Sequence, residues 1–391
     1  MNPGQGRGRW AAAVVAGLVL AAALAVVLVV VAPGPQRPHR RSPGPPATSP
    51  SATSTSTATP TPAPALPAPS TEAFGVNVNR LFNDFAYSSA QIRAQLAAVH
   101  ATGATIARSD ALWEATEPRA PVNGRHQYDW AFDDLIAGSL AAEGLAWLPI
   151  IDYTAPWAQS IPGQDHSPPR SDADYAAYAA AFAARYGPGG DFWRAHPELT
   201  ARPVGTMEIW NEPDQPEFWK PAPSPGAYAA LYQAARAAID AVQPGIRVII
   251  GGLTDPGGFL PQILQAAPGL RGHIDGVAIH PYGRPATVVS KVVAARATLD
   301  RLGMDGVPLY ATEFGWTTSP PGALDYVAAA QRPADIKSTL ARLGQVGCGL
   351  AMAMLYTWIT PGGNPDSSGN WYGIANPTQP ADGTADTAAF T

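Results

Sequence analysis

The chain has 391 residues, of which 46% are hydrophobic and 14% charged, which is enough for one large globular domain with additional segments. A net charge of −5 does not supply the concentrated basic surface that nucleic-acid binding requires. The single cysteine, Cys348, rules out an internal disulfide, and no cysteine and histidine residues have the spacing of zinc ligands. We therefore expect a buried, apolar role for Cys348 and no metal site.

The first 32 residues predict a membrane anchor. Residues 1–9 are polar and basic, and the 23 residues 10–32 carry no charge. A stretch of this length spans a bilayer and exceeds the apolar part of most cleaved signal peptides, and no small-residue cleavage pattern follows it. We expect 1–9 to be a short cytoplasmic tail and 10–32 a transmembrane signal anchor. Arginines flank both sides of the segment, so charge alone does not orient it.

Residues 33–73 predict an extended linker. Twelve prolines in 41 positions are interleaved with serine, threonine and alanine. Such a composition cannot bury a core and favours a partly polyproline stalk. Because Ser/Thr-Pro tracts are typical of glycosylated stalks of exported proteins, we expect the following domain to lie outside the cell, and to be secreted if the first segment is cleaved.

From residue 74 to the end, short apolar runs alternate with alanine-rich amphipathic segments. The expected strands are 74–78, 105–108, 145–152, 204–211, 247–252, 274–280, 308–313 and 350–358. The expected helices are 90–102, 128–143, 172–186, 225–242, 257–267, 286–302 and 334–345. Apolar strands alternating with helices predict a parallel sheet covered on both faces, and eight units in about 300 residues fit one (β/α)8 barrel. An open, doubly wound sheet is the alternative, but no glycine-rich phosphate loop follows the first strand.

Most of the predicted strands end in polar or aromatic side chains. These residues are Arg108 on strand two, Asp152 on three, Asn211 and Glu212 on four, His280 and Tyr282 on six, Glu313 on seven and Trp358 on eight. The carboxyl ends of barrel strands meet at one mouth, where catalytic groups lie. Any one of these residues alone fits an ordinary capping or surface role. Six strand ends together predict a shared site.

Glu212 and Glu313 predict chemistry on sugars. A retaining glycosidase uses one carboxylic acid to protonate the leaving oxygen and one carboxylate to attack the anomeric carbon, about 5–5.5 Å apart. We expect Arg108 to keep Glu313 ionised, while burial and the charge of Glu313 raise the pKa of Glu212. Tyr282 is expected to donate to Glu313, and Asn211 to bind the sugar 2-hydroxyl. This chemistry requires neither a metal nor an organic cofactor.

Three segments carry a family resemblance: Ile209-Trp210-Asn211-Glu212-Pro213, Ala278-Ile279-His280-Pro281-Tyr282 and Thr312-Glu313-Phe314-Gly315. They resemble the motifs of glycoside hydrolase clan A, the retaining (β/α)8 glycosidases with one glutamate on strand four and one on strand seven. Residues 105–114 and Asp129-Trp130 resemble family 39 and related cellulase-like members.

This resemblance covers nearly all of residues 74–376. It implies that Glu212 is the acid/base, Glu313 the nucleophile and Asn211 the ligand of the 2-hydroxyl. It also implies that subsite −1 is lined by Arg108, His280, Tyr282 and Trp358. Many family 39 members carry a β-sandwich domain as well. Here the chain ends soon after strand eight in a weakly patterned tail, which favours the bare-barrel members.

Aromatic residues beyond the strand ends offer flat rings for sugar stacking: Trp157, Trp219, Trp316, Trp358 and Trp371. Packing in the core or in loops is the alternative. Stacking is favoured for Trp358, and both roles stay open for Trp219. Trp157, Trp316 and Asp152 are also expected among the substrate-binding residues. Glu208, inside strand four, is expected to be a buried, paired carboxylate that supports the site.

The sequence thus predicts a membrane-anchored, outward-facing, monomeric retaining glycoside hydrolase of a poly- or oligosaccharide, with no cofactor and no nucleic-acid partner. One alternative is a stalked polysaccharide-binding protein on the same barrel, although both glutamates are present. A transglycosylase is another alternative, because it shares the covalent glycosyl intermediate and differs only in the acceptor.

Overall fold

The computed structural model describes residues 73–83, 87–360 and 366–375. The predicted tail and anchor at 1–32 lie outside this range, as does the stalk except for its last residue. Within the described part of the chain, no helix is both long and apolar enough to cross a membrane. The predicted anchor stays a prediction.

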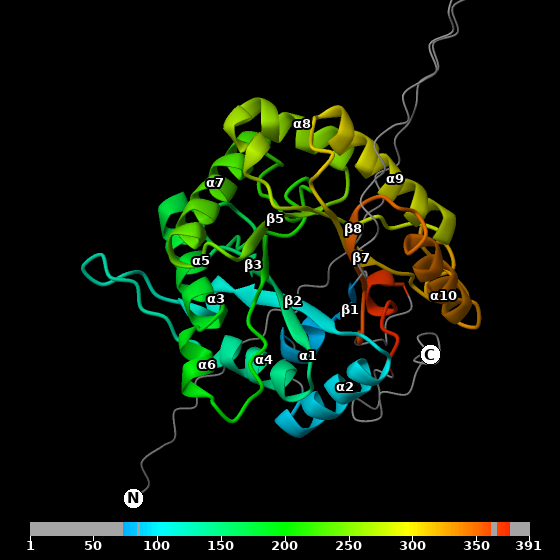
Figure 1. Ribbon diagram of the computed structural model, residues 1–391, viewed down its shortest axis with the longest axis horizontal. Coiled ribbons are helices and arrows are strands. Elements are labelled where there is room, and N and C mark those ends of the chain that lie inside the picture. Colours follow the sequence, from blue (N-terminus) through cyan, green and yellow to red (C-terminus); the bar gives the residue numbers. More distant parts are fainter. Residues whose placement is uncertain (1–72, 84–86, 361–365, 376–391) are drawn as a thin grey trace, which may run out of the picture.

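Eight parallel strands close into a barrel in the order of the sequence (Figure 1). They are β1 (Ala73–Asn77), β2 (Ile106–Leu112), β3 (Ala146–Asp152), β4 (Thr206–Ile209), β5 (Arg247–Leu253), β6 (Val277–Ile279), β7 (Leu309–Phe314) and β8 (Leu350–Leu355). β1 pairs with β2 on one side and with β8 on the other, which closes the sheet. The predicted (β/α)8 barrel is confirmed.

The longer helices of the described chain form the outer ring of the barrel (Figure 1). They are α2 (Ser89–Ala101), α4 (Ala131–Ala142), α5 (Asp172–Tyr186), α7 (Pro225–Val242), α8 (Pro256–Ala266), α9 (Pro285–Arg301) and α10 (Arg332–Leu343). Ser88, Ser171, Ser224 and Asp255 each cap a helix by accepting a hydrogen bond from a backbone N–H in its first turn. Prolines begin α7, α8 and α9, where the missing N–H costs no helical hydrogen bond.

Short helices occupy several of the connections. α1 (Asn79–Asn83) follows β1, α3 (Trp113–Thr116) follows β2, and α6 (Asp191–Ala195) precedes β4. Two 3-10 segments, Pro268–Gly272 and Ser368–Asn370, lie before β6 and after β8. α1 is important for the site because it lies directly after the carboxyl end of β1.

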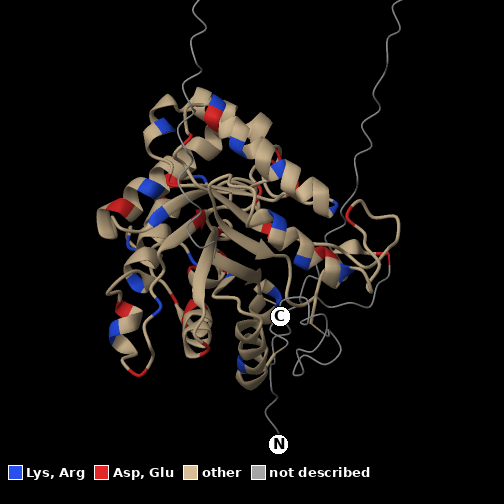
Figure 2. Cartoon of the chain, turned by 45° about the vertical axis from the view of Figure 1, so that its right-hand side comes forward, with Lys and Arg blue, Asp and Glu red and all other residues tan. Residues whose placement is uncertain are grey.

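The barrel interior changes from apolar to charged along its axis. A small apolar cluster drawn from five strands fills one part of it: Leu148, Ile249, Ala278, Tyr310, Met352 and Met354. A larger core packs the strands against the helices. Strand side chains alternate between the two faces, so Ile106, Arg108 and Asp110 of β2 share one face. Most charged side chains otherwise lie on the surrounding helices and loops (Figure 2).

The expected end of the second strand needs correction. β2 continues to Leu112, so Arg108 lies in the middle of the strand and not at its end. Residues 366–375 pack onto the barrel: Ile374 and Ala375 are buried and donate backbone hydrogen bonds to residues that follow β8. Residues 376–391 lie outside the described range.

Candidate active site

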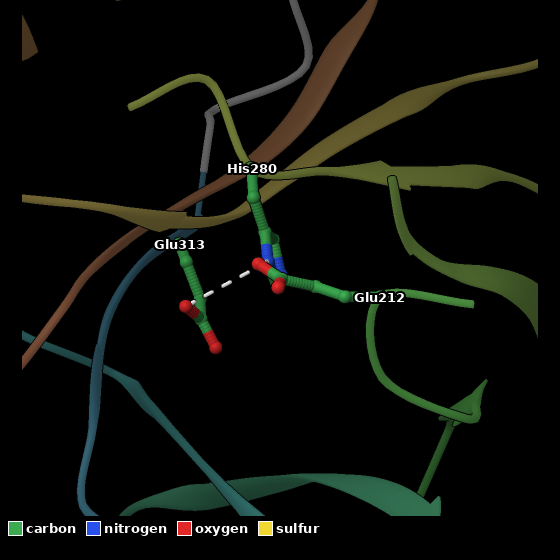
Figure 3. A group of neighbouring side chains, drawn as sticks. All are labelled: Glu212, His280 and Glu313. Atoms are coloured by element: carbon green, nitrogen blue, oxygen red, sulfur yellow. Dashed lines mark hydrogen bonds and ion pairs between the residues drawn. The ribbon is translucent and has the colours of Figure 1, made fainter. Parts of the chain in front are cut away.

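Glu212, His280 and Glu313 approach one another from three different strands at the carboxyl end of the barrel (Figure 3). Glu212 follows β4, His280 follows β6 and Glu313 is on β7. One ligand atom of each lies within 4.8 Å of the others, so the two carboxylates have oxygens at most that far apart. The site brings together the two glutamates that the sequence singled out.

A left-handed turn directs Glu212 into the mouth of the barrel. Trp210 has φ of 66° and Glu212 φ of 45°, values that side-chain-bearing residues rarely adopt. The indole Nε1 of Trp210 donates to the carbonyl of Phe218 at 2.7 Å, which fixes the turn from its buried side. Such backbone conformations persist where the surrounding structure imposes them, most often at functional sites.

Arg108 is the centre of a buried hydrogen-bond network under the two glutamates. Its Nη1 donates to Glu313 Oε1 at 2.6 Å and to Asn77 Oδ1 at 2.8 Å. Its Nε donates to Glu208 Oε2 at 2.8 Å, and its Nη2 to Asn211 Oδ1 at 2.9 Å. Burial lowers the pKa of Arg108, but Glu208 and Glu313 outweigh it and raise the pKa. The expected support role of Glu208, as a buried and paired carboxylate, is confirmed.

The surroundings of Glu313 favour its ionised form. Burial acts to raise the pKa of Glu313, but His280, Arg108 and the hydroxyl of Tyr282 together lower it below the ordinary glutamate value. Tyr282 donates to Glu313 Oε2 at 2.7 Å. The contacts expected from Arg108 and Tyr282 are both present.

The surroundings of Glu212 act in the opposite direction and favour its neutral form. Burial and the charge of Glu313 raise its pKa above the ordinary glutamate value, against the opposing effect of His280. Its Oε1 lies 2.6 Å from His280 Nδ1. The other ring nitrogen of His280, Nε2, is 3.1 Å from Thr312 Oγ1. Burial lowers the pKa of His280, whereas Glu313 and Glu212 raise it by more.

His280 fits against β5 because residue 252 is glycine. A Cβ on Gly252 would lie 2.0 Å from His280 Nε2. The backbone N–H of Gly252 also donates to Glu208 Oε1 at 2.8 Å, which joins β5 to the network of Arg108. The absence of a side chain at Gly252 therefore provides the space in which the imidazole lies.

A cavity of about 230 Å³ opens above the two glutamates and extends to α1 and β2. Its lining residues are Asn79, Arg80, Asn83, Asp110, Ile150, Tyr153, Asn211, Glu212, Phe218, Glu313, Tyr356 and Thr357. Most of these were not expected from the sequence. Asp110 had a usable signal, because it lies two residues after Arg108 and so on the same face of β2.

Of the eight expected substrate-binding residues, Asn211 lines this cavity and seven do not. Arg108, His280 and Tyr282 lie behind the lining and contact the two glutamates. The other four lie elsewhere. Trp358 is fully buried and its Nε1 donates to Gln95 on α2 at 2.7 Å, so the indole belongs to the layer between barrel and helices. Trp316 is likewise buried, and its Nε1 donates to the carbonyl of Gly283. Trp157 is half-buried and donates to the carbonyl of Glu117. Sugar stacking by these three indoles is not supported, and Tyr356 lines the cavity instead of Trp358.

Asp152 does not line the cavity either. It is fully buried, and within the described ranges neither carboxyl oxygen has a hydrogen-bond partner. Burial, and next the charge of Asp110, raises its pKa well above the ordinary aspartate value. A neutral carboxyl group beneath the surface fits this setting better than a group that contacts substrate.

Glu212, His280 and Glu313 also have the geometry of possible metal ligands. Each of these groups already has a hydrogen-bond partner in the protein. His280 is bonded to Glu212, and Arg108 and Tyr282 are bonded to Glu313. The three side chains therefore fit a pair of hydrogen-bonded carboxyl groups whose pKa values are shifted in opposite directions.

No protein-family model matches the sequence, and no curated protein matches it. Solved structures do match. A monomeric β-xylosidase from Caulobacter crescentus CB15 superposes with a TM-score of 0.63 at 19% identity, over 82% of this chain and 67% of that one. The GH39 enzyme from Xanthomonas axonopodis pv. citri gives 0.62 at 18% identity, over 82% and 65%. A structure from a study of two fungal β-1,4-galactanases gives 0.54 at 16%, over 81% and 98%.

The chain thus spans about two thirds of the first two structures, and nearly the whole of the galactanase. At these identities the likeness concerns the fold. The resemblance to clan A barrels, family 39 among them, is confirmed at that level: this chain has the fold of solved (β/α)8 glycosidases, with Glu212 after its fourth strand and Glu313 on its seventh.

Proposed function

We propose that the protein is a retaining glycoside hydrolase. The observation that carries the proposal is the pair Glu212 and Glu313, in which one carboxylate oxygen of each lies within 4.8 Å of the other and the pKa values are shifted in opposite directions. Inverting enzymes separate their carboxyl groups by about 6.5–9.5 Å to admit a water, and retaining enzymes by about 5–5.5 Å. The short spacing favours direct attack by one carboxylate.

In this mechanism Glu313 attacks the anomeric carbon while Glu212 protonates the departing glycosidic oxygen. The C–O bond to the leaving group breaks as the ester bond to Glu313 forms. Glu212, now ionised, then takes a proton from water, whose oxygen displaces Glu313 from the anomeric carbon and restores both groups. Arg108 and Tyr282 hold the carboxylate of Glu313 in place, and Asn211 is assigned to the sugar 2-hydroxyl.

The substrate we propose is a β-linked poly- or oligosaccharide met outside the cell. The named activities of the similar structures, xylosidase and galactanase, support a β-linkage. The location follows from the apolar segment 10–32 and the proline-rich segment 33–73. The same features support a single-pass anchor with the barrel outside, acting as a monomer.

The rate should depend on pH as a bell-shaped curve. Glu313 must be ionised, and its lowered pKa places the acid limb of kcat/KM below the ordinary glutamate value. Glu212 must be protonated, and its raised pKa places the alkaline limb above that value. Initial rates of the full-length chain on an aryl glycoside across the pH range measure both limbs. An alkaline limb that persists in Glu212→Gln would contradict the assignment of Glu212.

The direct test is hydrolysis of a panel of aryl β-glycosides and envelope polysaccharides by the full-length chain and by Glu212→Gln. We expect the variant to lose about 10²- to 10⁴-fold on glycosides whose leaving group needs a proton. It should lose little in the first step on 2,4-dinitrophenyl glycosides, which need none. Glu217→Gln, an exposed glutamate of the same connection, is the matched control.

Two outcomes would replace this function. A parent chain that is inert across the panel, yet binds a polysaccharide as tightly as Glu212→Gln does, would identify a stalked binding protein. Products longer than the substrate, formed in preference to hydrolysis, would identify a transglycosylase.

A further inference from the structure

A third carboxylate lines the same cavity as the two glutamates. It belongs to Asp110 on β2, and both of its oxygens are held by amides of α1. Asn79 Nδ2 donates to Oδ1 at 2.7 Å, and Asn83 Nδ2 donates to Oδ2 at 2.5 Å. Two amide donors on one side fix the plane of the carboxylate and leave its remaining lone pairs for other donors.

This part of the cavity wall has acceptors that lack donors. Asn79 Oδ1 and Asn83 Oδ1 are buried, and within the described residues neither has a hydrogen-bond partner. Burial raises the pKa of Asp110, and the hydrogen bonds from Asn83 and Asn79 act against that rise. Buried polar groups in folded proteins are almost always paired. The wall formed by Asn79, Asn83 and Asp110 therefore has the chemistry of a site completed by hydrogen-bond donors.

Asn79, Asn83 and Asp110 line the same cavity as the two glutamates, which indicates which hydroxyl groups of a bound sugar could reach them. Asn211, Glu212 and Glu313 line the same cavity, so a pyranose whose anomeric carbon lies at Glu313 places its ring in the space that Asp110 also lines. Hydroxyl groups on ring carbons remote from the anomeric centre are then the donors that reach Asp110. The nearby Arg80 also lines the cavity, on the same helix as the two asparagines.

We propose that Asp110, oriented by Asn79 and Asn83, determines sugar specificity by accepting hydrogen bonds from hydroxyl groups of a pyranoside remote from its anomeric carbon. This inference rests on the proposed glycosidase function and adds the recognition group. A hydrogen bond to a charged acceptor inside a dry site discriminates strongly against an analogue that lacks the donor, because the carboxylate then stays unpaired.

The test pairs a protein change with a substrate change. Rates are measured for the full-length chain and for Asp110→Asn on 4-nitrophenyl β-glucoside, β-galactoside, β-mannoside and β-xyloside. The best of these is then compared with its 3-, 4- and 6-deoxy analogues, as the sugar allows. In the parent chain, removal of the contacted hydroxyl should lower kcat/KM by about 10- to 100-fold. In Asp110→Asn the same removal should cost little.

Two further variants make the result specific. Asn83→Ala keeps the carboxylate and removes one of its supports, and we expect an intermediate dependence on the same hydroxyl. Asp191→Asn changes an exposed aspartate on α6 and should leave every rate ratio as in the parent chain. Thermal unfolding of all variants separates loss of fold from loss of recognition, and Asn83→Ala remains informative if Asp110→Asn does not fold.

The outcomes distinguish this inference from the function on which it rests. If the parent chain hydrolyses one glycoside and Asp110→Asn loses rate equally on that glycoside and on all its deoxy analogues, Asp110 contacts no hydroxyl and the inference is overturned while the glycosidase stands. If the parent hydrolyses none of the panel, the glycosidase assignment is overturned, and the role of Asp110 with it.

Discussion

Glu313→Gln is expected to lower kcat by on the order of 10⁴-fold or more, because it removes the nucleophile while leaving the shape of the site unchanged. The carboxamide oxygen can still accept from Arg108, which lies 2.6 Å from Oε1, and the amide nitrogen in the place of Oε2 can donate to the hydroxyl oxygen of Tyr282, which lies 2.7 Å away. The fold should therefore survive. Turnover of an activated aryl glycoside, which needs no acid, measures the loss from the nucleophile alone.

Covalent trapping gives the same assignment from an independent measurement. A 2-deoxy-2-fluoro glycoside with a good leaving group should add one glycosyl mass to the parent chain, located on the peptide that carries Glu313. Glu313→Gln should gain no mass, whereas Glu198→Gln, an exposed glutamate, should be labelled like the parent. A label found on Glu212 would reverse the roles of the two carboxyl groups, and hydrolysis with inversion at the anomeric carbon would exclude the covalent route.

The positions of the two glutamates could be predicted because each follows a short run of apolar residues whose length and neighbours indicate a buried strand. Ile209 and Phe314 are both fully buried in the barrel, so the polar residues beside them had to lie at the mouth. The expected contacts of Arg108 and Tyr282 with Glu313 follow from the same reasoning, since all three converge on one end of the barrel.

The misplaced tryptophans show the limit of that reasoning. β8 ends at Leu355 and not at residue 358, so Tyr356 and Trp358 both lie beyond the strand, where the alternation of faces no longer holds. The cavity receives Tyr356, while Trp358 packs against α2. Bulk and apolarity gave no indication of the face.

The wall formed by Asn79, Asn83 and Asp110 was hidden for a different reason. α1 has only five residues and no apolar periodicity long enough to be recognised as a helix. Without that helix, two asparagines four positions apart have no common face. The pairing of α1 with β2 through Asp110 is a tertiary contact that local sequence does not encode.

Arg108 is the residue on which both stability and activity depend most among the supports of the site. Arg108→Met should destabilise the fold by about 3–5 kcal/mol at neutral pH, because Glu208 and Glu313 would then be buried charges without their cation. Activity should fall as well, because Glu313 loses a charge that lowers its pKa. The acid limb of the pH profile is therefore expected to move to higher pH.

The sign of the pH dependence of stability distinguishes this explanation from simple loss of packing. In the parent chain the lowered pKa of Glu313 contributes stability above its unfolded pKa, and that contribution is lost as pH falls through the folded value. The stability difference between parent and Arg108→Met should therefore be largest near neutral pH and shrink as pH falls. Leu96→Ala, a change at a fully buried, uncharged side chain of α2, should show a stability difference that does not change in this range.

A double variant completes the argument. Glu208→Gln alone removes the charge of one carboxylate that pairs with Arg108. Arg108→Met/Glu208→Gln removes both charges of that ion pair. If charge pairing carries the effect, the double variant should be more stable than Arg108→Met, with a coupling measurable by urea unfolding. The double variant should remain nearly inactive, because Glu313 still lacks Arg108. Additive stability losses would mean that Arg108 acts by filling space, and that Glu313 is kept ionised by His280 and Tyr282 without it.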